Sequence, residues 1–258
     1  MGWYWSGCAN QAKWGLEIGG LAAIDIDNHT AFHLEAVQTL NTDDQTLSDW
    51  YAGAISDRKE TLMGISKYLV ADAWFSKKPF TDQIVSLEMH LISRLRDDAD
   101  LKYLYKGPHT GKKGRPRKYD GKIIIKDINK EYFTFISEDE ESSVYAAEVY
   151  SKSLKRNIML VHVTYPKANG KDACKLYFST DVLMDPSDVL LYYHSRFQIE
   201  FLYRDGKQHT GLNDSQARSV NKLHFQFNAS LTSINIAKAI HWLSIPKEER
   251  EAFSMSDI

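Results

Sequence analysis

Short β-forming runs alternate with segments of helical periodicity along this chain, and that alternation limits its fold more than any other feature. Residues 16–39 contain two apolar or alternating runs joined by a turn-forming DNH sequence, which predicts an antiparallel hairpin. Residues 46–66 carry apolar side chains at helical spacing and are predicted to be a helix. A short strand ending at Asp72, a helix after Pro79 and a strand near residues 91–95 follow. This order predicts an α/β domain.

The middle of the chain has a different composition. Residues 107–122 read GPHTGKKGRPRKYDGK, are almost empty of apolar side chains, and are predicted to be a linker or an exposed loop. β-forming runs return in residues 123–181, separated by charged or Asn-Gly turns. We therefore expect an all-β stretch after the basic segment.

Helices are predicted again in the last third of the chain. Asp185 suits a helix N-cap, and Pro186 suits the first helical position, so a long helix should begin here. Residues 223–243 have apolar side chains at helical spacing and predict a second, buried helix. Pro246 marks the end of that helix.

Four residues of the first of these helices stand in the pattern Y-x2-R-x3-E-x6-K, namely Tyr193, Arg196, Glu200 and Lys207. At about 100° per residue they fall within an arc of roughly 60°, so one helix face would carry a ring, two cations and a carboxylate. Gly206 can end the helix and displace the lysine that follows it. Taken alone, Arg196 and Glu200 also fit an ordinary i,i+4 pair on a solvated face.

The four-residue pattern and several further segments resemble the DDE transposases of bacterial insertion sequences, in the group conventionally numbered four. The resemblance covers nearly the whole chain. The similar segments, in order, are WSGCANQAKWGLEIGGLAAIDIDNHTAFHLEAVQT, VADAWFSKKPF, GRPRKYDGK and YHSRFQIEFLYRDGKQHTGL.

The resemblance implies a ribonuclease H-like catalytic domain with a mixed sheet, interrupted by a β-rich insertion. Its implied activity is metal-dependent strand cleavage and strand transfer at insertion-sequence ends. Asp72 and Glu200 would be catalytic and would bind Mg²⁺, or Mn²⁺ in its place, while Tyr193, Arg196 and Lys207 would hold phosphates. Without the resemblance, Asp72 is equally well a simple strand-end aspartate.

Four segments follow from this interpretation. Residues 1–105 would form the first part of the ribonuclease H-like domain, and residues 106–184 the basic loop and β-rich insertion. Residues 185–245 would contain the glutamate helix and the C-terminal helices, followed by a tail over residues 246–258.

The first catalytic aspartate of such transposases lies on a first strand, upstream of a Trp-Ser-Gly segment. That segment begins here at Trp5, and no acidic residue precedes it. We therefore expect a chain that lacks the first strand. Asp25 and Asp27 are the early alternatives, although Asp favours turns and both fall at the predicted hairpin turn.

DNA contact must come from local patches, because the formal net charge of the chain is -2. Arg115 and Arg117 lie in a Gly-Arg-Pro-Arg core that resembles an AT-hook, in which arginines enter a narrow minor groove. A solvated basic loop is the alternative interpretation. Non-specific phosphate contact is expected from either.

Three functions remain open at this point: an active transposase, an inactive DNA-binding remnant of one, and a ribonuclease H-like metal-dependent nuclease. The expected partners are double-stranded DNA at transposon ends and a second copy of the chain in a synaptic complex. The two cysteines, Cys8 and Cys174, are far apart, and no apolar run could span a bilayer. A bacterial cytoplasmic location, associated with the nucleoid and not with a membrane, is expected.

Overall fold

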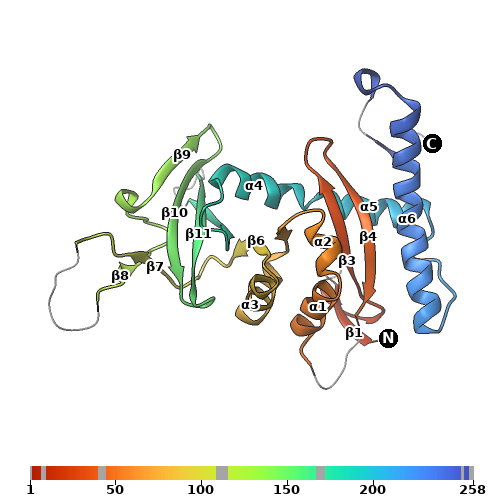
Figure 1. Cartoon of the computed structure of the whole chain (residues 1–258), viewed down its shortest axis with the longest axis horizontal. Helices are drawn as coiled ribbons and strands as arrows, with labels where there is room; N and C mark the ends of the chain where they lie inside the picture. The colour runs from red at the N-terminus through yellow and green to blue at the C-terminus, as the bar shows by residue number, and fades with distance from the viewer. Residues whose placement is uncertain are drawn as a thin grey trace. The chain divides into compact units, whose positions relative to one another are not determined.

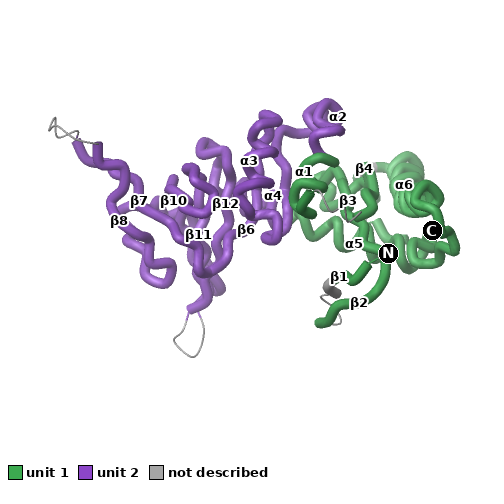
Figure 2. The backbone as a smooth tube through the Cα atoms, turned by 90° about the horizontal axis from the view of Figure 1, so that it is seen from below, with its two compact units in different colours: residues 1–54, 195–258 green, residues 55–194 purple. Residues whose placement is uncertain are grey.

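The computed structural model describes most of the chain in two compact units. The described residues are 2–6, 10–39, 45–108, 116–166, 172–250 and 253–255. Unit 1 contains residues 1–54 and 195–258, and unit 2 contains residues 55–194 (Figure 2). Each unit is described by itself below.

Unit 1 is built around an antiparallel hairpin. Strand β3 (Ile18–Asp25) pairs with β4 (Thr30–Gln38), with Asp25 opposite Thr30. The intervening turn places His29 in the left-handed region at φ 49°. The hairpin predicted from the sequence is therefore confirmed. A second pair is formed by β1 (Gly2–Ser6) and β2 (Gln11–Gly15).

Two helices pack on this hairpin. Helix α5 (Gln198–His209) contacts both strands, and the longer α6 (Val220–Ser244) lies beside β4 (Figure 1). The Ser219 side chain accepts a hydrogen bond from the Lys222 amide and caps α6. The helix predicted over residues 223–243 is thus confirmed, but it is buried on one side only, since Phe225 and Leu243 of α6 are 74% and 88% exposed. The apolar core between these elements consists of Ala36, Leu202, Leu212, Leu223, Phe227, Leu231 and Ile234.

Side-chain amides of α6 bind the outer edge of β4. Asn235 accepts a hydrogen bond from the His33 amide at 2.9 Å and donates to the His33 carbonyl at 2.7 Å. Asn228 does the same for Ala36, at 2.9 and 3.2 Å. We call this set of four hydrogen bonds the amide bridge. It satisfies backbone groups that an edge strand would otherwise leave unpaired.

A buried lysine supplements the amide bridge. The Lys238 ammonium donates to the Ala31 carbonyl at 2.7 Å and lies near the rings of Phe32 and Phe253. Its side chain is buried, and burial lowers the pKa of this lysine.

Unit 2 is dominated by one mixed sheet. Within the described residues its order is β5-β6-β12-β11-β10-β7-β8, and β9 pairs with β10. Strands β5 and β6 are parallel, and the other pairs are antiparallel. The strands are β5 (Tyr68–Val70), β6 (His90–Leu95), β7 (Leu101–Leu104), β8 (Tyr119–Lys122), β9 (Thr134–Glu138), β10 (Ser143–Ser151), β11 (Arg156–Tyr165) and β12 (Ala173–Ser179).

The core of unit 2 lies along the central strands of this sheet, where Leu160 of β11 and its partner Phe178 of β12 are fully buried. Residues 134–179 contain β9 to β12, so the β-rich stretch is confirmed. Helices and 3-10 turns complete the fold. In unit 2 they are α2 (Lys59–Met63), η1 (Ala73–Phe75), α3 (Lys78–Ser86), η2 (Lys130–Tyr132) and α4 (Pro186–Ser195), whose last residue belongs to unit 1. Most of α1 (Leu47–Ser56) belongs to unit 1, as does η3 (Lys247–Glu249).

Three local predictions were wrong. The single helix expected over residues 46–66 is two helices, because the chain tightens after α1, where the Arg58 amide bonds to the Ile55 carbonyl at 3.0 Å. The predicted basic loop over residues 107–122 ends in strand β8, which pairs with β7. The long helix expected after Pro186 is divided into α4 and α5. The mixed α/β class itself is confirmed.

In the part of the chain that the structure describes, no helix has the length and apolar character needed to cross a bilayer.

Candidate active site

Asp72 lies just beyond the carboxyl end of β5, and its backbone is tied to the neighbouring strand β6. The Ala71 amide donates to the Ile92 carbonyl at 3.0 Å, and the Ser93 hydroxyl donates to the Asp72 carbonyl at 3.1 Å. The Asp72 carboxylate accepts a hydrogen bond from the Ala73 amide at 2.5 Å and caps η1. The main chain at Asp72 is therefore held by the parallel pairing of β5 with β6, while the Asp72 carboxylate remains exposed.

Glu200 lies in the first turn of α5 with its side chain 50% exposed. The opposite side of the helix is buried, since Leu202 and Gly206 face the core of unit 1. Lys207 follows two turns after Glu200 and is also exposed, so the two share the solvent face of α5. Arg204 lies on the same face and is 56% exposed.

Gly206 does not end α5, contrary to the alternative considered from the sequence. The helix continues to His209. A Cβ atom on Gly206 would lie 2.9 Å from the Leu231 side chain of α6, so the absence of a side chain permits close packing of the two helices. The glycine thus serves packing, and Lys207 remains helical.

The backbone tightens between α4 and α5. The amides of Ile199 and Glu200 bond to carbonyls three residues earlier, at Arg196 and Phe197, each at 3.0 Å. This is 3-10 geometry, which interrupts the regular helix. The prediction that Tyr193, Arg196, Glu200 and Lys207 occupy one continuous helix face was therefore wrong.

The structure brings two of those four residues into direct contact. The Arg196 guanidinium donates to a Glu200 carboxylate oxygen at 3.1 Å, so the i,i+4 pair is present. Tyr193 belongs to unit 2, where its ring packs on the buried Tyr177 at 4.9 Å between centroids. Burial raises the pKa of Tyr177 well above its ordinary value.

Asp25 is engaged in the hairpin turn. One of its carboxylate oxygens accepts from the Asn28 amide at 3.0 Å and the other from the Asn28 side chain at 2.9 Å. These bonds are those of a turn-forming aspartate, which is the structural role considered for it from the sequence. Asp27 lies in the same turn.

The basic segment is only partly described. Arg115 lies outside the described residues. Arg117 forms an ion pair with an Asp120 carboxylate oxygen at 2.8 Å and donates to the Tyr119 carbonyl at 3.1 Å, and its guanidinium lies over the Tyr105 ring. Arg117 is therefore bonded to the start of β8, although its side chain is 63% exposed.

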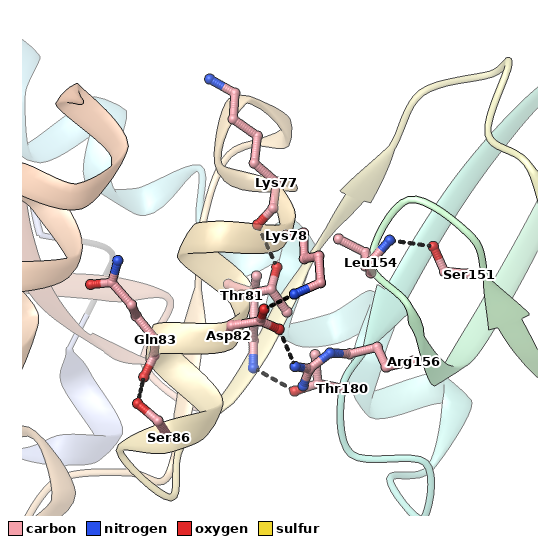
Figure 3. Close-up of polar contacts among 11 residues, drawn as sticks. Lys77, Lys78, Thr81, Asp82, Gln83, Ser86, Ser151, Leu154, Arg156 and Thr180 are labelled. Carbon is pink, nitrogen blue, oxygen red and sulfur yellow. Dashed lines mark hydrogen bonds and ion pairs between the residues drawn. The ribbon is translucent and has the colours of Figure 1, made fainter. Parts of the chain in front are cut away.

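Polar contacts at the start of α3 were not foreseen from the sequence. Asp82 accepts hydrogen bonds from Lys78 of α3 and from Arg156 of β11, and the bond from Lys78 is the main cause of its lowered pKa. Figure 3 shows that the neighbouring Lys77 side chain points away from this group. The Lys77 ammonium instead lies 3.5 Å from the centroid of the Trp74 ring.

No three His, Cys, Asp or Glu side chains within the described residues form a group that could hold a metal ion. Asp72 belongs to unit 2 and Glu200 to unit 1. Their convergence on a shared metal ion therefore stays a prediction, as do the four domain boundaries.

The fold and these residues can now be set beside known proteins. A comparison with curated proteins gave no match. A family model described as the transposase DDE domain matches residues 27–236, which is more than half of the chain and includes both Asp72 and Glu200. The mixed sheet and its helices agree with the ribonuclease H-like fold expected of such a domain. The chain belongs to the family of transposases with a DDE domain.

Proposed function

We propose that this chain acts at the ends of an insertion sequence of the group numbered four, where it catalyses metal-dependent strand cleavage and strand transfer. The observation that carries the proposal is the pair of exposed carboxylates on the matched family segment: Asp72 on a bonded strand end, and Glu200 in the first turn of a packed helix. Both scaffolds limit the motion of a carboxylate while leaving it open to solvent.

The two carboxylates suit a hard divalent cation. Asp72 and Glu200 each use one oxygen in a hydrogen bond, to Ala73 and Arg196 respectively. In the described part of the chain, the second oxygen of each has no hydrogen bond and is available as a ligand. Mg²⁺ prefers oxygen ligands of this kind, and Mn²⁺ accepts the same set. When bound, such an ion stabilises charge on the attacking and leaving oxygens of a phosphodiester.

Cations beside Glu200 fit the phosphates of a DNA end. Arg196 and Lys207 are the residues expected to bind them, and Arg204 lies with Lys207 on the exposed face of α5. A guanidinium binds a phosphate through paired hydrogen bonds, whereas a lysine acts as a point charge. We assign Tyr193 to this phosphate site as well, and Arg115 and Arg117 to contacts with DNA away from the reacting strand.

Iron-dependent backbone cleavage tests whether Asp72 and Glu200 share a metal ion. Fe²⁺ replaces Mg²⁺, and ascorbate with peroxide then generates hydroxyl radicals at the bound ion. We expect cuts near residue 72 and near residue 200 in the same sample, both suppressed by excess Mg²⁺. Asp72→Asn should remove both sets of cuts, as should Glu200→Gln. Asp98→Asn, which changes an exposed carboxylate paired with Arg96, serves as the matched control.

The same variants are then assayed for nicking and joining of the element's own terminal DNA. Asp72→Asn and Glu200→Gln should each reduce cleavage by a factor of at least about 100, because the loss of a metal ligand removes most of the metal's contribution. Cuts at only one of the two segments would contradict the shared site, as would a Glu200→Gln variant that retains full cleavage.

DNA binding without cleavage is the second candidate function. It is favoured by the bonding of Asp25, whose two oxygens are both taken by Asn28, so that Asp72 and Glu200 are the two carboxylates assigned to metal. Terminal DNA that is bound but never cut would establish this function. Cutting of any DNA without preference for the element's ends would instead indicate a metal-dependent nuclease.

A further inference from the structure

We propose that Trp74 and Lys77 form a stacking platform for an unpaired nucleobase of the DNA end, directly beside the carboxylate of Asp72. The inference rests on the proposed function, since it names a part of the substrate that the same site would recognise. Trp74 and Lys77 are neither proposed metal ligands nor proposed phosphate-binding residues. The inference gives them a role in substrate specificity.

Trp74 combines an exposed indole with a position close to Asp72 in the chain. Trp74 lies in η1, two residues after Asp72, and 41% of its surface is exposed. Tryptophan is normally well buried, because its ring offers a large apolar area. An indole with this exposure, two residues after a proposed catalytic carboxylate, offers aromatic surface to a substrate bound there.

The indole is held by a rigid aromatic series. The Trp74 ring meets Phe75 edge to face at 4.9 Å, and Phe75 packs on Phe80 at 4.8 Å. Phe80 is 1% exposed and anchors the series in the core of unit 2. A ring fixed in this way loses little conformational entropy when a ligand stacks on it.

Hydrogen bonds fix the η1 backbone in the same way. The Ser76 hydroxyl donates to the Arg94 carbonyl at 2.7 Å and lies 2.8 Å from the Ser93 hydroxyl, which itself bonds the Asp72 carbonyl. Ser93 therefore bonds the Asp72 backbone to β6, and Ser76, at the end of η1, bonds the turn that contains Trp74 to the same strand. The carboxylate and the indole should keep a constant separation when DNA binds.

Lys77 supplies a positive charge to this platform. Its ammonium lies 3.5 Å from the Trp74 ring centroid, in a cation–π contact. The adjacent Lys78 is paired with Asp82, and the Lys77 side chain points away from that pair (Figure 3). Lys77 can therefore meet the phosphate attached to a stacked base without breaking an ion pair with Asp82.

An unpaired base is the ligand that this chemistry fits. Every base has a π-face that can stack on an indole, and a neighbouring cation favours the phosphate of the same nucleotide. A base inside an intact duplex is already stacked between its neighbours and cannot reach a side chain in this way. Trp74 should thus discriminate a frayed or extruded base from paired DNA.

The test compares three DNA probes of equal duplex sequence, with Ca²⁺ in place of Mg²⁺ so that binding is measured apart from cutting. One is blunt, one carries a short adenine overhang, and one carries the same overhang with abasic sugars. Fluorescence anisotropy gives the Kd of each. We expect the wild-type chain to bind the adenine overhang about 10-fold more tightly than the abasic overhang, a ratio typical of stacking one base on an aromatic ring.

Variants locate the platform. Trp74→Ala should abolish the preference for the adenine overhang and leave binding of the blunt duplex unchanged, whereas Trp74→Phe should keep part of the preference. Lys77→Ala should weaken binding of both overhang probes, because the phosphate remains in an abasic overhang. Trp14→Ala is the matched control: Trp14 is 58% exposed on β2 in unit 1 and should show the wild-type preference.

Equal affinity of the wild-type chain for the adenine and abasic overhangs would overturn the inference while leaving the proposed function intact. So would an unchanged preference in Trp74→Ala. Failure of the wild-type chain to bind any of the three probes would count against the proposed function itself, and this inference would fail with it.

Discussion

The hairpin of unit 1 and the sheet of unit 2 satisfy their backbone hydrogen bonds in different ways. In unit 2, neighbouring strands bond one another from β5 across to β8 through main-chain groups. In unit 1, the outer edge of β4 is bonded by the side chains of Asn228 and Asn235 on α6. A main-chain ladder depends weakly on residue type, whereas the amide bridge depends on two particular asparagines.

This difference extends to the proposed active site. Asp72 is held by the main-chain ladder of β5 and β6, and Glu200 by a helix packed against the hairpin and α6. Substitutions that loosen one scaffold should therefore affect one carboxylate more than the other. The predictions below test that separation.

The largest effect is expected in the core of unit 2. Phe178→Ala removes a fully buried ring from β12 and should lower the free energy of unfolding by about 4 kcal/mol, because a cavity remains in a packed core. Chemical denaturation measures the loss. Hydrogen exchange should show faster exchange in β11 and β12 than in β3 and β4.

The matched control for this change is Phe135→Ala on β9, where the ring is 53% exposed. We expect a loss below about 1 kcal/mol. A uniform rise in exchange over both units of Phe178→Ala would show that the two scaffolds unfold together, and the comparison would then fail.

An intermediate effect is expected at the amide bridge. Asn235→Leu leaves the His33 amide and carbonyl without their partners, and should lower the free energy of unfolding by roughly 3 kcal/mol. Exchange of the β4 amides should rise first. Asn157→Leu is the control, since Asn157 is exposed on β11 and its side chain bonds only Glu148 in the described part of the chain. Equal losses in the two variants would remove the special role of the amide bridge.

The smallest effect is the expected loss of folding stability at acidic pH. His162 of unit 2 bonds the Ile125 carbonyl at 2.7 Å, and burial lowers its pKa from the ordinary value of 6.5. The unfolded chain therefore binds a proton here at a pH where the folded chain does not. Stability should fall as the pH drops below the ordinary histidine pKa, by at most about 1.4 kcal/mol per pH unit.

His33 of unit 1 also has a pKa lowered by burial, so the two histidines allow the same test in each unit. His162→Gln should reduce the loss of stability between about pH 7 and about pH 5, measured by denaturation at each pH. His33→Gln should act on unit 1 in the same direction. An unchanged pH dependence in both variants would refute the assignment.

Local signals predicted much of the fold. The β3–β4 hairpin follows from two β-forming runs and a DNH turn, and α4 begins where Asp185 accepts a hydrogen bond from the Ser187 amide. Asp72 was placed at a strand end from its sequence context alone. These features depend on residues that are close together in the chain.

The errors and omissions depend on tertiary contacts. A glycine at position 206 suggested a helix end, but in the structure Gly206 packs closely against Leu231 of α6. The amide bridge joins residues about 200 positions apart, and asparagine within a helix gives no signal of such a partner. Trp74 could have been singled out, because an aromatic residue and two lysines follow the strand-end aspartate, but only its exposure separates it from a core residue.

The amide bridge also sets an order of events during synthesis. Asn235 follows His33 by 202 residues, so the partner of β4 emerges from the ribosome long after the hairpin. At ~5–20 residues per second, this delay is roughly 10–40 s. During that interval the β4 edge offers unpaired donors and acceptors to any strand nearby. We expect nascent chains of this protein to depend on chaperones until α6 has been made.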